Sequence, residues 1–216
     1  MSFLSEPLLS YIEQMSEPEP EYLYQIRREA HLRLVQPQML VGAYEGRLLT
    51  LITALANPLR VLEIGTYCGY SALCLAEGLQ KKEALVHTLE QNDELEELIQ
   101  HNFSRSPYSE QIKLHIGNAL ELLPSLLQKE TFDLVYLDAD KRQYVDYYQL
   151  ILPFLPSGAL VIADNTLWSG KILQNPMPLD AQTTGIDAFN RLVATDPRVQ
   201  CSLLPVRDGI TLIRIK

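Results

Sequence analysis

Polar side chains suited to metal binding follow two apolar runs in the second half of the chain. Asp138 ends one run, and Asp164 and Asn165 directly follow the next. Two carboxylates and an amide offer only oxygen ligands, which select hard divalent cations such as Mg²⁺, Ca²⁺ or Mn²⁺. The alternative for the segment 138–141, DADK, is a solvated strand end that caps the next helix. The second group of polar residues favours the metal site.

A second stretch with chemical meaning is the segment 61–71, VLEIGTYCGYS. A short apolar run ends at Gly65, Gly69 follows, and a helical pattern begins near Tyr70. Such a turn lets the backbone approach a nucleotide-like ligand at a helix N-terminus. Glu90 ends the next apolar run, where a carboxylate suits a ribose diol. The dinucleotide fingerprint Gly-x-Gly-x-x-Gly is absent, and an ordinary strand-to-helix turn remains the alternative.

Alternating strands and helices must position these residues. Apolar runs predict strands at 60–64, 84–90, 112–116, 134–138 and 159–163, and helical patterns lie between them at 70–79, 92–102, 119–128 and 142–152. This alternation predicts an α/β fold with a doubly wound, mostly parallel sheet. A helix at about 185–195 and a hairpin of 199–205 with 210–215 complete seven strands, the last one antiparallel.

The predicted topology brings the polar residues together. In a doubly wound sheet the first and fourth strands are neighbours, and ligands bind at the carboxyl ends of the strands beside this switch point. We therefore expect Gly65, Asp138 and Asp164 to share one rim.

Helices also precede the first strand, at 3–15, 20–35 and 43–56. We expect one domain over residues 1–216, with 1–57 as a helical extension within it. The first helix places Leu8, Leu9 and Ile12 on one face. Because these apolar faces exceed what the sheet needs, we expect a homodimer built partly from the N-terminal helices.

Composition limits the partners and the compartment. The chain has 216 residues and a net charge of −9, which argues against a broad nucleic-acid footprint. Three cysteines give no disulfide framework and predict reduced thiols. No uninterrupted apolar run reaches the ~18 residues of a membrane span, and no secretory signal is recognisable. We expect a cytoplasmic protein without a membrane partner.

Together, three segments resemble the signatures of a known family. The segments 63–71 (EIGTYCGYS), 137–141 (LDADK) and 164–170 (DNTLWSG) resemble those of the cation-dependent O-methyltransferases. This is the caffeoyl-CoA and catechol O-methyltransferase group, which uses S-adenosylmethionine on a Rossmann-like domain. The resemblance runs from about Val41 to the C-terminus. DADK is the caffeoyl-CoA-like and bacterial form, and the substrate acid of the animal catechol enzyme is absent.

The resemblance implies roles by position. It implies cofactor binding by Val41, Glu63, Gly65, Thr66, Tyr67, Ser71, Glu90, Ala119, Asp138 and Asp140. It implies metal binding by Asp138, Asp164 and Asn165, with Mg²⁺ or another hard divalent cation. Lys141 matches the lysine that acts on the acceptor hydroxyl, with Asp138 beside it, and Trp168 and Ser169 would lie near the acceptor. A surface lysine that pairs with Asp146 is the alternative for Lys141, and packing is the alternative for Trp168. Tyr144, Tyr147 and Tyr148 are expected to pack rather than bind substrate.

Three functions remain open. The first is Mg²⁺-dependent methyl transfer from S-adenosylmethionine to a hydroxyl of a catechol-like small molecule, such as a caffeoyl-type phenolic. The second is methylation of a hydroxylated uridine in tRNA, assisted by Arg27, Arg28 and Arg33. Given the charge, a solvated helix face is the preferred interpretation of these arginines. The third is an oxidoreductase or a non-catalytic nucleotide-binding domain, against which the missing fingerprint and the complete metal set argue.

Overall fold

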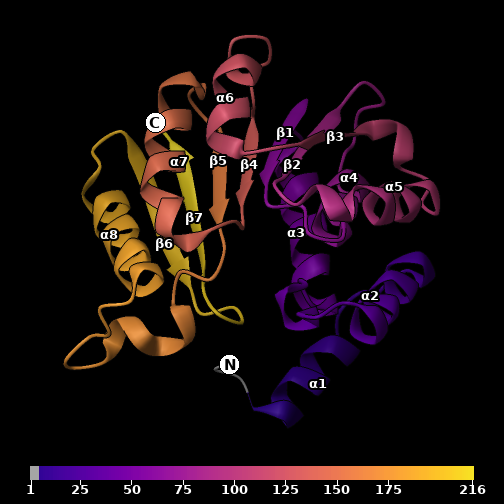
Figure 1. The fold of residues 1–216 in the computed structure, drawn as a ribbon, viewed down its shortest axis with the longest axis horizontal. Helices are drawn as coiled ribbons and strands as arrows, with labels where there is room; N and C mark the ends of the chain where they lie inside the picture. The colour runs from indigo at the N-terminus through magenta and orange to yellow at the C-terminus, as the bar shows by residue number, and fades with distance from the viewer. Residues whose placement is uncertain (1–4) are drawn as a thin grey trace.

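The central feature of the fold is a sheet with helices on both faces, seen in Figure 1 of the computed structural model, which describes residues 5–216. Within these residues, seven strands pair in the order β3-β2-β1-β4-β5-β7-β6. They are β1 (Arg60–Ile64), β2 (Leu85–Glu90), β3 (Ile112–Ile116), β4 (Leu134–Leu137), β5 (Leu160–Ala163), β6 (Val199–Leu204) and β7 (Ile210–Ile215). Only β7 runs against its neighbours, pairing antiparallel with β5 and β6. The predicted doubly wound sheet with a reversed last strand is confirmed.

The helices follow the predicted alternation, with differences at their ends. They are α1 (Glu6–Gln14), α2 (Glu21–Arg33), α3 (Ala43–Ala56), α4 (Tyr70–Glu77), α5 (Glu96–Ser104), α6 (Ala119–Leu127), α7 (Tyr144–Ile151) and α8 (Ala181–Thr195). Short 3-10 turns include η1 (Pro37–Met39), η4 (Lys141–Gln143) and η6 (Trp168–Leu173). The last helix starts earlier than predicted because the Asp180 carboxylate accepts the backbone N–H of Thr183 at 3.0 Å. Phe3 and Leu4, the predicted start of the first helix, lie outside the described residues.

Two apolar cores, one on each face, hold the helices to the sheet. One core joins the sheet to α6, α7 and α8, and includes Leu137, Tyr144 and Phe189. The other joins it to α2, α3, α4 and α5, and includes Tyr70 and Tyr136. Figure 1 shows α6, α7 and α8 together on one side of the molecule. The strand ends between these layers remain open to a ligand.

The register of the parallel strands aligns their carboxyl ends. Ile64 of β1 pairs with Leu137 of β4, which pairs in turn with Ala163 of β5. Gly65 and the residues that follow β4 and β5 therefore reach the same edge of the sheet. Gly65 has φ +103°, and a Cβ there would lie 2.0 Å from the carbonyl oxygen of Asp138. Only glycine fits this approach of the two chain segments.

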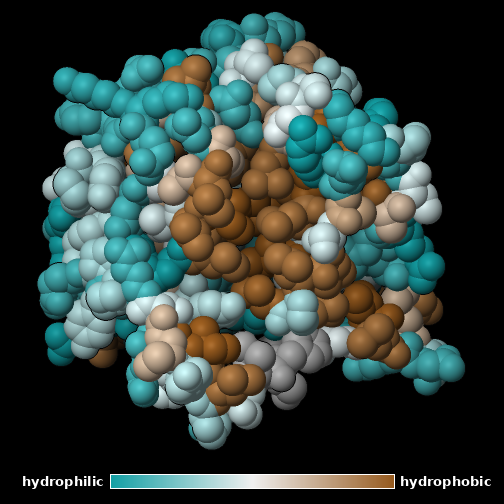
Figure 2. Space-filling model, turned by 180° about the vertical axis from the view of Figure 1, so that it is seen from behind, coloured by the Kyte–Doolittle hydropathy of each residue, from teal (hydrophilic) through white to brown (hydrophobic). Residues whose placement is uncertain are grey.

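A broad apolar area covers part of the rear face of the molecule (Figure 2). On α3, Leu51 and Leu55 are 56% and 78% exposed, and Leu48 and Ile52 are partly buried. Their spacing places all four on one side of the helix. This partly exposed helix face contrasts with the opposite face of α3, which packs on α4.

Within residues 5–216, one helical segment, Pro37–Ala56, is long and apolar enough by length and composition to cross a membrane. The sequence analysis considered only uninterrupted apolar runs, so it did not predict that this segment has the length and composition of a membrane span. Within the fold, however, Glu45 and Arg47 of this segment make ion pairs with Arg207 and Glu77, and Leu49 is fully buried. The fold therefore buries part of this segment, while Leu51 and Leu55 remain exposed.

Candidate active site

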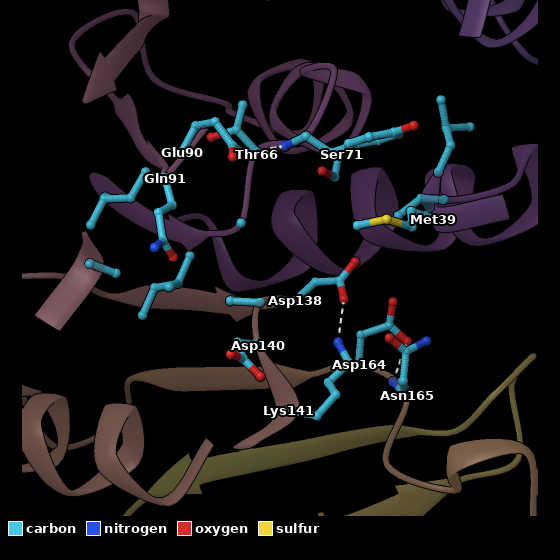
Figure 3. Close-up of a pocket in the computed structure, with 18 of the residues that line it drawn as sticks. Met39, Thr66, Ser71, Glu90, Gln91, Asp138, Asp140, Lys141, Asp164 and Asn165 are labelled. Atoms are coloured by element: carbon cyan, nitrogen blue, oxygen red, sulfur yellow. Dashed lines mark hydrogen bonds and ion pairs between the residues drawn. The ribbon is translucent and has the colours of Figure 1, made fainter. Parts of the chain in front are cut away.

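A cavity of about 620 Å³ opens at the edge where the strand ends meet. The turns after β1, β4 and β5 and the end of β2 line it. The N-terminal segment around Met39 and the β6–β7 hairpin complete its walls. In Figure 3, Thr66, Ser71 and Glu90 lie across the cavity from Lys141 and Asp164. The predicted switch-point cleft is thus present, with the glycine turn and the acidic strand ends in one chamber.

Most residues expected to bind the cofactor line this cavity. They are Val41, Gly65, Thr66, Tyr67, Ser71, Glu90, Ala119, Asp138 and Asp140. Asp140 also accepts from the guanidinium of Arg142, which, as the largest cause, lowers the pKa of this carboxyl. The structure therefore brings these residues together around one volume.

Glu90 is held in place by two backbone donors. Its Oε2 accepts the N–H of Tyr67 at 2.7 Å, and its Oε1 accepts the N–H of Asn92 at 2.8 Å. A carboxylate oxygen has two lone pairs, so each oxygen can still accept another hydrogen bond. Glu90 is therefore fixed at the rim with acceptor capacity left for a ribose diol.

Glu63 differs from the expectation, because its side chain does not line the cavity. It is fully buried on β1, where Thr88 donates to Oε2 and Oε1 has no hydrogen-bond partner among the described residues. Burial is the main cause that raises its pKa, to about 8. Near neutral pH this carboxyl therefore adds little negative charge to the rim, where the sequence had indicated an acidic group.

The three expected metal ligands all line the cavity. The Asp164 carboxylate accepts the backbone N–H of Asn165 at 2.6 Å on Oδ1, and the hydroxyl of Tyr136 at 3.0 Å on Oδ2. Burial raises the pKa of Asp164 well above its usual range, and the nearby charges of Glu45 and Asp138 raise it further. Crowded, poorly solvated carboxylates of this kind are strongly attracted to a cation.

The donor set fits a hard cation by its chemistry. Among residues 5–216, no three His, Cys, Asp or Glu side chains are grouped to hold a metal ion. The expected set has two carboxylates, Asp138 and Asp164, and completes its ligands with the Asn165 amide. In addition, the buried Oε1 of Glu45 has no hydrogen-bond partner in the part of the chain that the structure describes, although this residue interacts electrostatically with both aspartates. A divalent cation would relieve the repulsion among these groups.

Lys141 is buried in the site rather than exposed at the surface. Its side chain is 8% exposed, and Nζ donates to Oδ1 of Asp138 at 2.6 Å and to the Tyr144 hydroxyl at 2.7 Å. The Tyr144 hydroxyl lies 3.0 Å from the carbonyl oxygen of Leu137 and 3.1 Å from that of Asp164. The surface-lysine alternative is therefore wrong, and the ammonium is fixed beside an expected metal ligand.

The two residues expected near the acceptor differ in position. Trp168 lines the cavity, and its Nε1 donates to Oγ1 of Thr183 at 3.1 Å. Ser169 is exposed and does not line the cavity, and its backbone N–H donates to Asp208. The 3-10 turn η6 directs the two side chains differently, which sequence spacing did not indicate.

The α7 tyrosines also separate. Tyr144 and Tyr148 pack edge-on against Phe189, with ring centroids 5.3 and 5.9 Å apart, as expected. Tyr147 lines the cavity instead.

An ion pair that sequence analysis missed crosses the cavity wall. Arg207 Nη1 in the β6–β7 hairpin lies 2.8 Å from Oε2 of Glu45 in the first turn of α3. The two residues are 162 positions apart, so no local pattern connects them. The pair links the N-terminal wall of the cavity to the hairpin.

Comparison with known proteins agrees with this geometry. A family model described as O-methyltransferase matches residues 13–216. Caffeoyl-CoA O-methyltransferase 2 of Eucalyptus globulus is 33% identical over 224 residues, which cover 97% of this chain and 89% of that protein. Catechol O-methyltransferase of Niastella koreensis is 30% identical over 187 residues, which cover 83% of this chain and 84% of that protein.

A solved structure is similar over nearly the whole chain. The O-methyltransferase from Bacillus cereus in complex with SAH, S-adenosylhomocysteine, has a TM-score of 0.88 and 26% identity. The match covers 96% of each chain.

Proposed function

The chain belongs to the S-adenosylmethionine-dependent O-methyltransferases of the caffeoyl-CoA and catechol type, and we propose that its acceptor is a vicinal diol, such as a catechol-type phenolic, methylated with the help of a hard divalent cation. Asp138, Asp164 and Asn165 would hold the cation. The observation that carries the proposal is the position of Lys141, buried against Asp138 in the cavity that also contains the glycine turn. Activation of an acceptor oxygen and binding of the methyl donor are thus served by one chamber.

The cofactor site follows from the same cavity. S-adenosylmethionine supplies a methyl group on a cationic sulfonium. Glu90 would accept from the ribose hydroxyls, while the carboxylates of Asp138 and Asp140 give the sulfonium side of the cavity a negative character. Ser71, in the first turn of α4, would donate to the amino-acid carboxylate of the cofactor. These contacts orient the donor, and orientation is the main contribution a protein makes to such a transfer.

The hydroxyl of a phenolic acceptor must lose its proton for the methyl transfer. A phenol titrates near ~10, so it is mostly protonated at neutral pH. A bound hard cation would lower that pKa. Lys141 would steer the hydroxyl proton and stabilise the oxyanion, and Tyr144 keeps the ammonium in position by accepting its second hydrogen bond. A vicinal diol offers two oxygens to this set of groups, whereas a simple phenol offers one.

The names of the relatives support a diol acceptor. Caffeoyl and catechol groups both carry adjacent ring hydroxyls. The nucleic-acid alternative has weaker support, because Arg27 is already paired with Glu19 at 2.8 Å and the net charge is −9. Small-molecule diols are therefore the preferred acceptor class.

An acceptor panel tests the proposal. Purified protein, labelled S-adenosylmethionine and Mg²⁺ are incubated with catechol, caffeate, a caffeoyl thioester, matched mono-hydroxy analogues and bulk tRNA. We expect label on the diols at rates at least tenfold above the mono-hydroxy analogues. Label on tRNA alone, or equal rates for diols and single phenols, would contradict the proposed acceptor class.

A further inference from the structure

Tyr136 is a polar residue inside an otherwise apolar strand. It lies on β4, two residues before Asp138, and its side chain is fully buried in the core on the α3 side of the sheet. It does not line the cavity. Among the described residues, the side-chain hydrogen bond of Tyr136 runs from the hydroxyl to Oδ2 of Asp164, at 3.0 Å. This bond connects the buried phenol directly to a residue of the cavity wall.

The bond determines which lone pairs of Asp164 remain free. An ionised carboxylate has about four acceptor positions. Tyr136 uses one on Oδ2 from the sheet side, and the backbone N–H of Asn165 uses one on Oδ1 at 2.6 Å. Because Asp164 lines the cavity, the two donors from behind hold the carboxylate plane while acceptor capacity remains on both oxygens.

The surroundings explain why a donor is needed there. Asp138 and Glu45 both repel the Asp164 carboxylate. Arg207, which is ion-paired with Glu45, and Lys141, which is ion-paired with Asp138, both attract it. A carboxylate without the Tyr136 hydroxyl would be free to turn toward either cation. The Tyr136 bond opposes this movement.

We propose that Tyr136 is a positioning residue of the cation site, fixing Asp164 from behind so that its oxygens serve the same cation as Asp138 and Asn165. The inference rests on the proposed cation dependence and adds to it a residue outside the ligand set. Outer donors to metal-ligating carboxylates commonly change metal affinity by about 10–100-fold. Phenylalanine at this position keeps the buried ring and removes only the donor.

The chain offers a matched control. Tyr148 is also fully buried, and its hydroxyl donates to Oδ2 of Asp196 at the same distance, 3.0 Å. Asp196 does not line the cavity. Tyr148→Phe therefore removes the same kind of bond from a carboxylate without an expected role in cation binding.

The test measures cation binding directly. Mn²⁺ binding to the parent, Tyr136→Phe and Tyr148→Phe is titrated by electron paramagnetic resonance in the presence of S-adenosylhomocysteine, and Mg²⁺ binding by calorimetry. We expect Tyr136→Phe to bind Mn²⁺ about 10–100-fold more weakly, and Tyr148→Phe to match the parent. S-adenosylhomocysteine affinity and thermal unfolding show that each variant is folded. In turnover, Tyr136→Phe should need more Mg²⁺ yet approach the parental kcat at saturation.

The outcomes separate the two claims. A parent protein without saturable Mn²⁺ binding would refute the cation site and this inference together. Saturable binding that is equal in the parent and Tyr136→Phe, or equally weakened in both tyrosine variants, would refute the inference alone. Low kcat in Tyr136→Phe at saturating Mg²⁺ would also overturn it.

Discussion

Lys141, the first residue of η4, and Asp138, three residues before it, form a 2.6 Å ion pair between Nζ and Oδ1. The pair joins the residue expected to act on the acceptor proton to an expected cation ligand. Both side chains line the cavity, and the Tyr144 hydroxyl prevents the ammonium from leaving. The structure therefore fixes Lys141 and this expected cation ligand next to each other in the cavity.

Removal of the Lys141 ammonium should slow chemistry more than binding. We expect Lys141→Ala to lower kcat by about 10²–10⁴-fold, the usual contribution of a positioned acid or base. S-adenosylhomocysteine affinity should hardly change. Steady-state kinetics on a competent diol, with exposed Lys129→Ala as the control, checks this. A kcat within twofold of the parent would show that Lys141 has no part in the reaction.

Glu90 should dominate recognition of the ribose. Glu90→Ala removes a charged acceptor pair, and we expect a loss on the order of 2–3 kcal/mol in S-adenosylhomocysteine affinity. Glu90→Gln should also weaken binding, because each Glu90 oxygen accepts a backbone N–H and the amide nitrogen of glutamine cannot accept one. Calorimetry on both variants and on Glu97→Ala, an exposed change on α5, measures the effect. Unchanged affinity in Glu90→Ala would remove this residue from the cofactor site.

Glu63 predicts a specific dependence of stability on pH. Burial raises its pKa from 4.5 to about 8 in the folded protein. The protonated form is therefore favoured by folding, so its stabilising contribution is complete below about pH 4.5 and is lost as the pH rises through 8. Glutamine cannot ionise, so the melting temperature of Glu63→Gln relative to the parent should increase between pH 5 and pH 9. Exposed Glu121→Gln is the control, and a pH-independent difference would show that Glu63 does not titrate in this range.

The sequence predicts which residues lie at the ends of the strands, but it predicts less well what the buried side chains beneath those strand ends do. Gly65, Asp138 and Asp164 meet because strand periodicity and turn residues define the sheet order, and these patterns are local. In the sequence, nothing distinguishes Tyr136 from other strand residues. Only the structure shows that its hydroxyl donates a hydrogen bond to Asp164. Glu63 was placed at the cofactor by its position in a motif, but its side chain is buried beneath the turn.

Long-range pairs and irregular turns explain the remaining differences. Glu45 and Arg207 lie on elements far apart in the sequence, so only the tertiary fold reveals their ion pair. Trp168 and Ser169 both have a positive φ, 48° and 51°, so this loop departs from regular structure and its side-chain directions do not follow from sequence spacing. Neither feature has a periodic signal in the sequence.

Exposed apolar faces support the expected homodimer. Leu51 and Leu55 on α3 belong to the partly exposed face of that helix, and Leu8 on α1 is 45% exposed. Contiguous apolar surface of this kind commonly marks an interface, and two copies of one chain can cover the same face symmetrically. We expect light scattering to give twice the mass of the chain.

Substitutions on α3 test where the copies meet. Leu55→Arg should shift the protein toward monomer and raise the concentration at which it dimerises. Leu179→Arg, at a leucine that is 86% exposed elsewhere, should leave the mass unchanged. A monomeric parent at working concentration would contradict the dimer, and a dimeric Leu55→Arg would exclude this face.

The most direct test of the central claim is turnover with and without a divalent cation. Protein treated with chelator until metal analysis shows no residual metal is supplied with labelled S-adenosylmethionine and an accepted diol. We expect no methylated product, and full recovery when Mg²⁺ or Mn²⁺ is added, because Asp138, Asp164 and Asn165 form an oxygen-only set at the acceptor end of the cavity. Undiminished methyl transfer by the metal-free protein would contradict the cation-dependent mechanism.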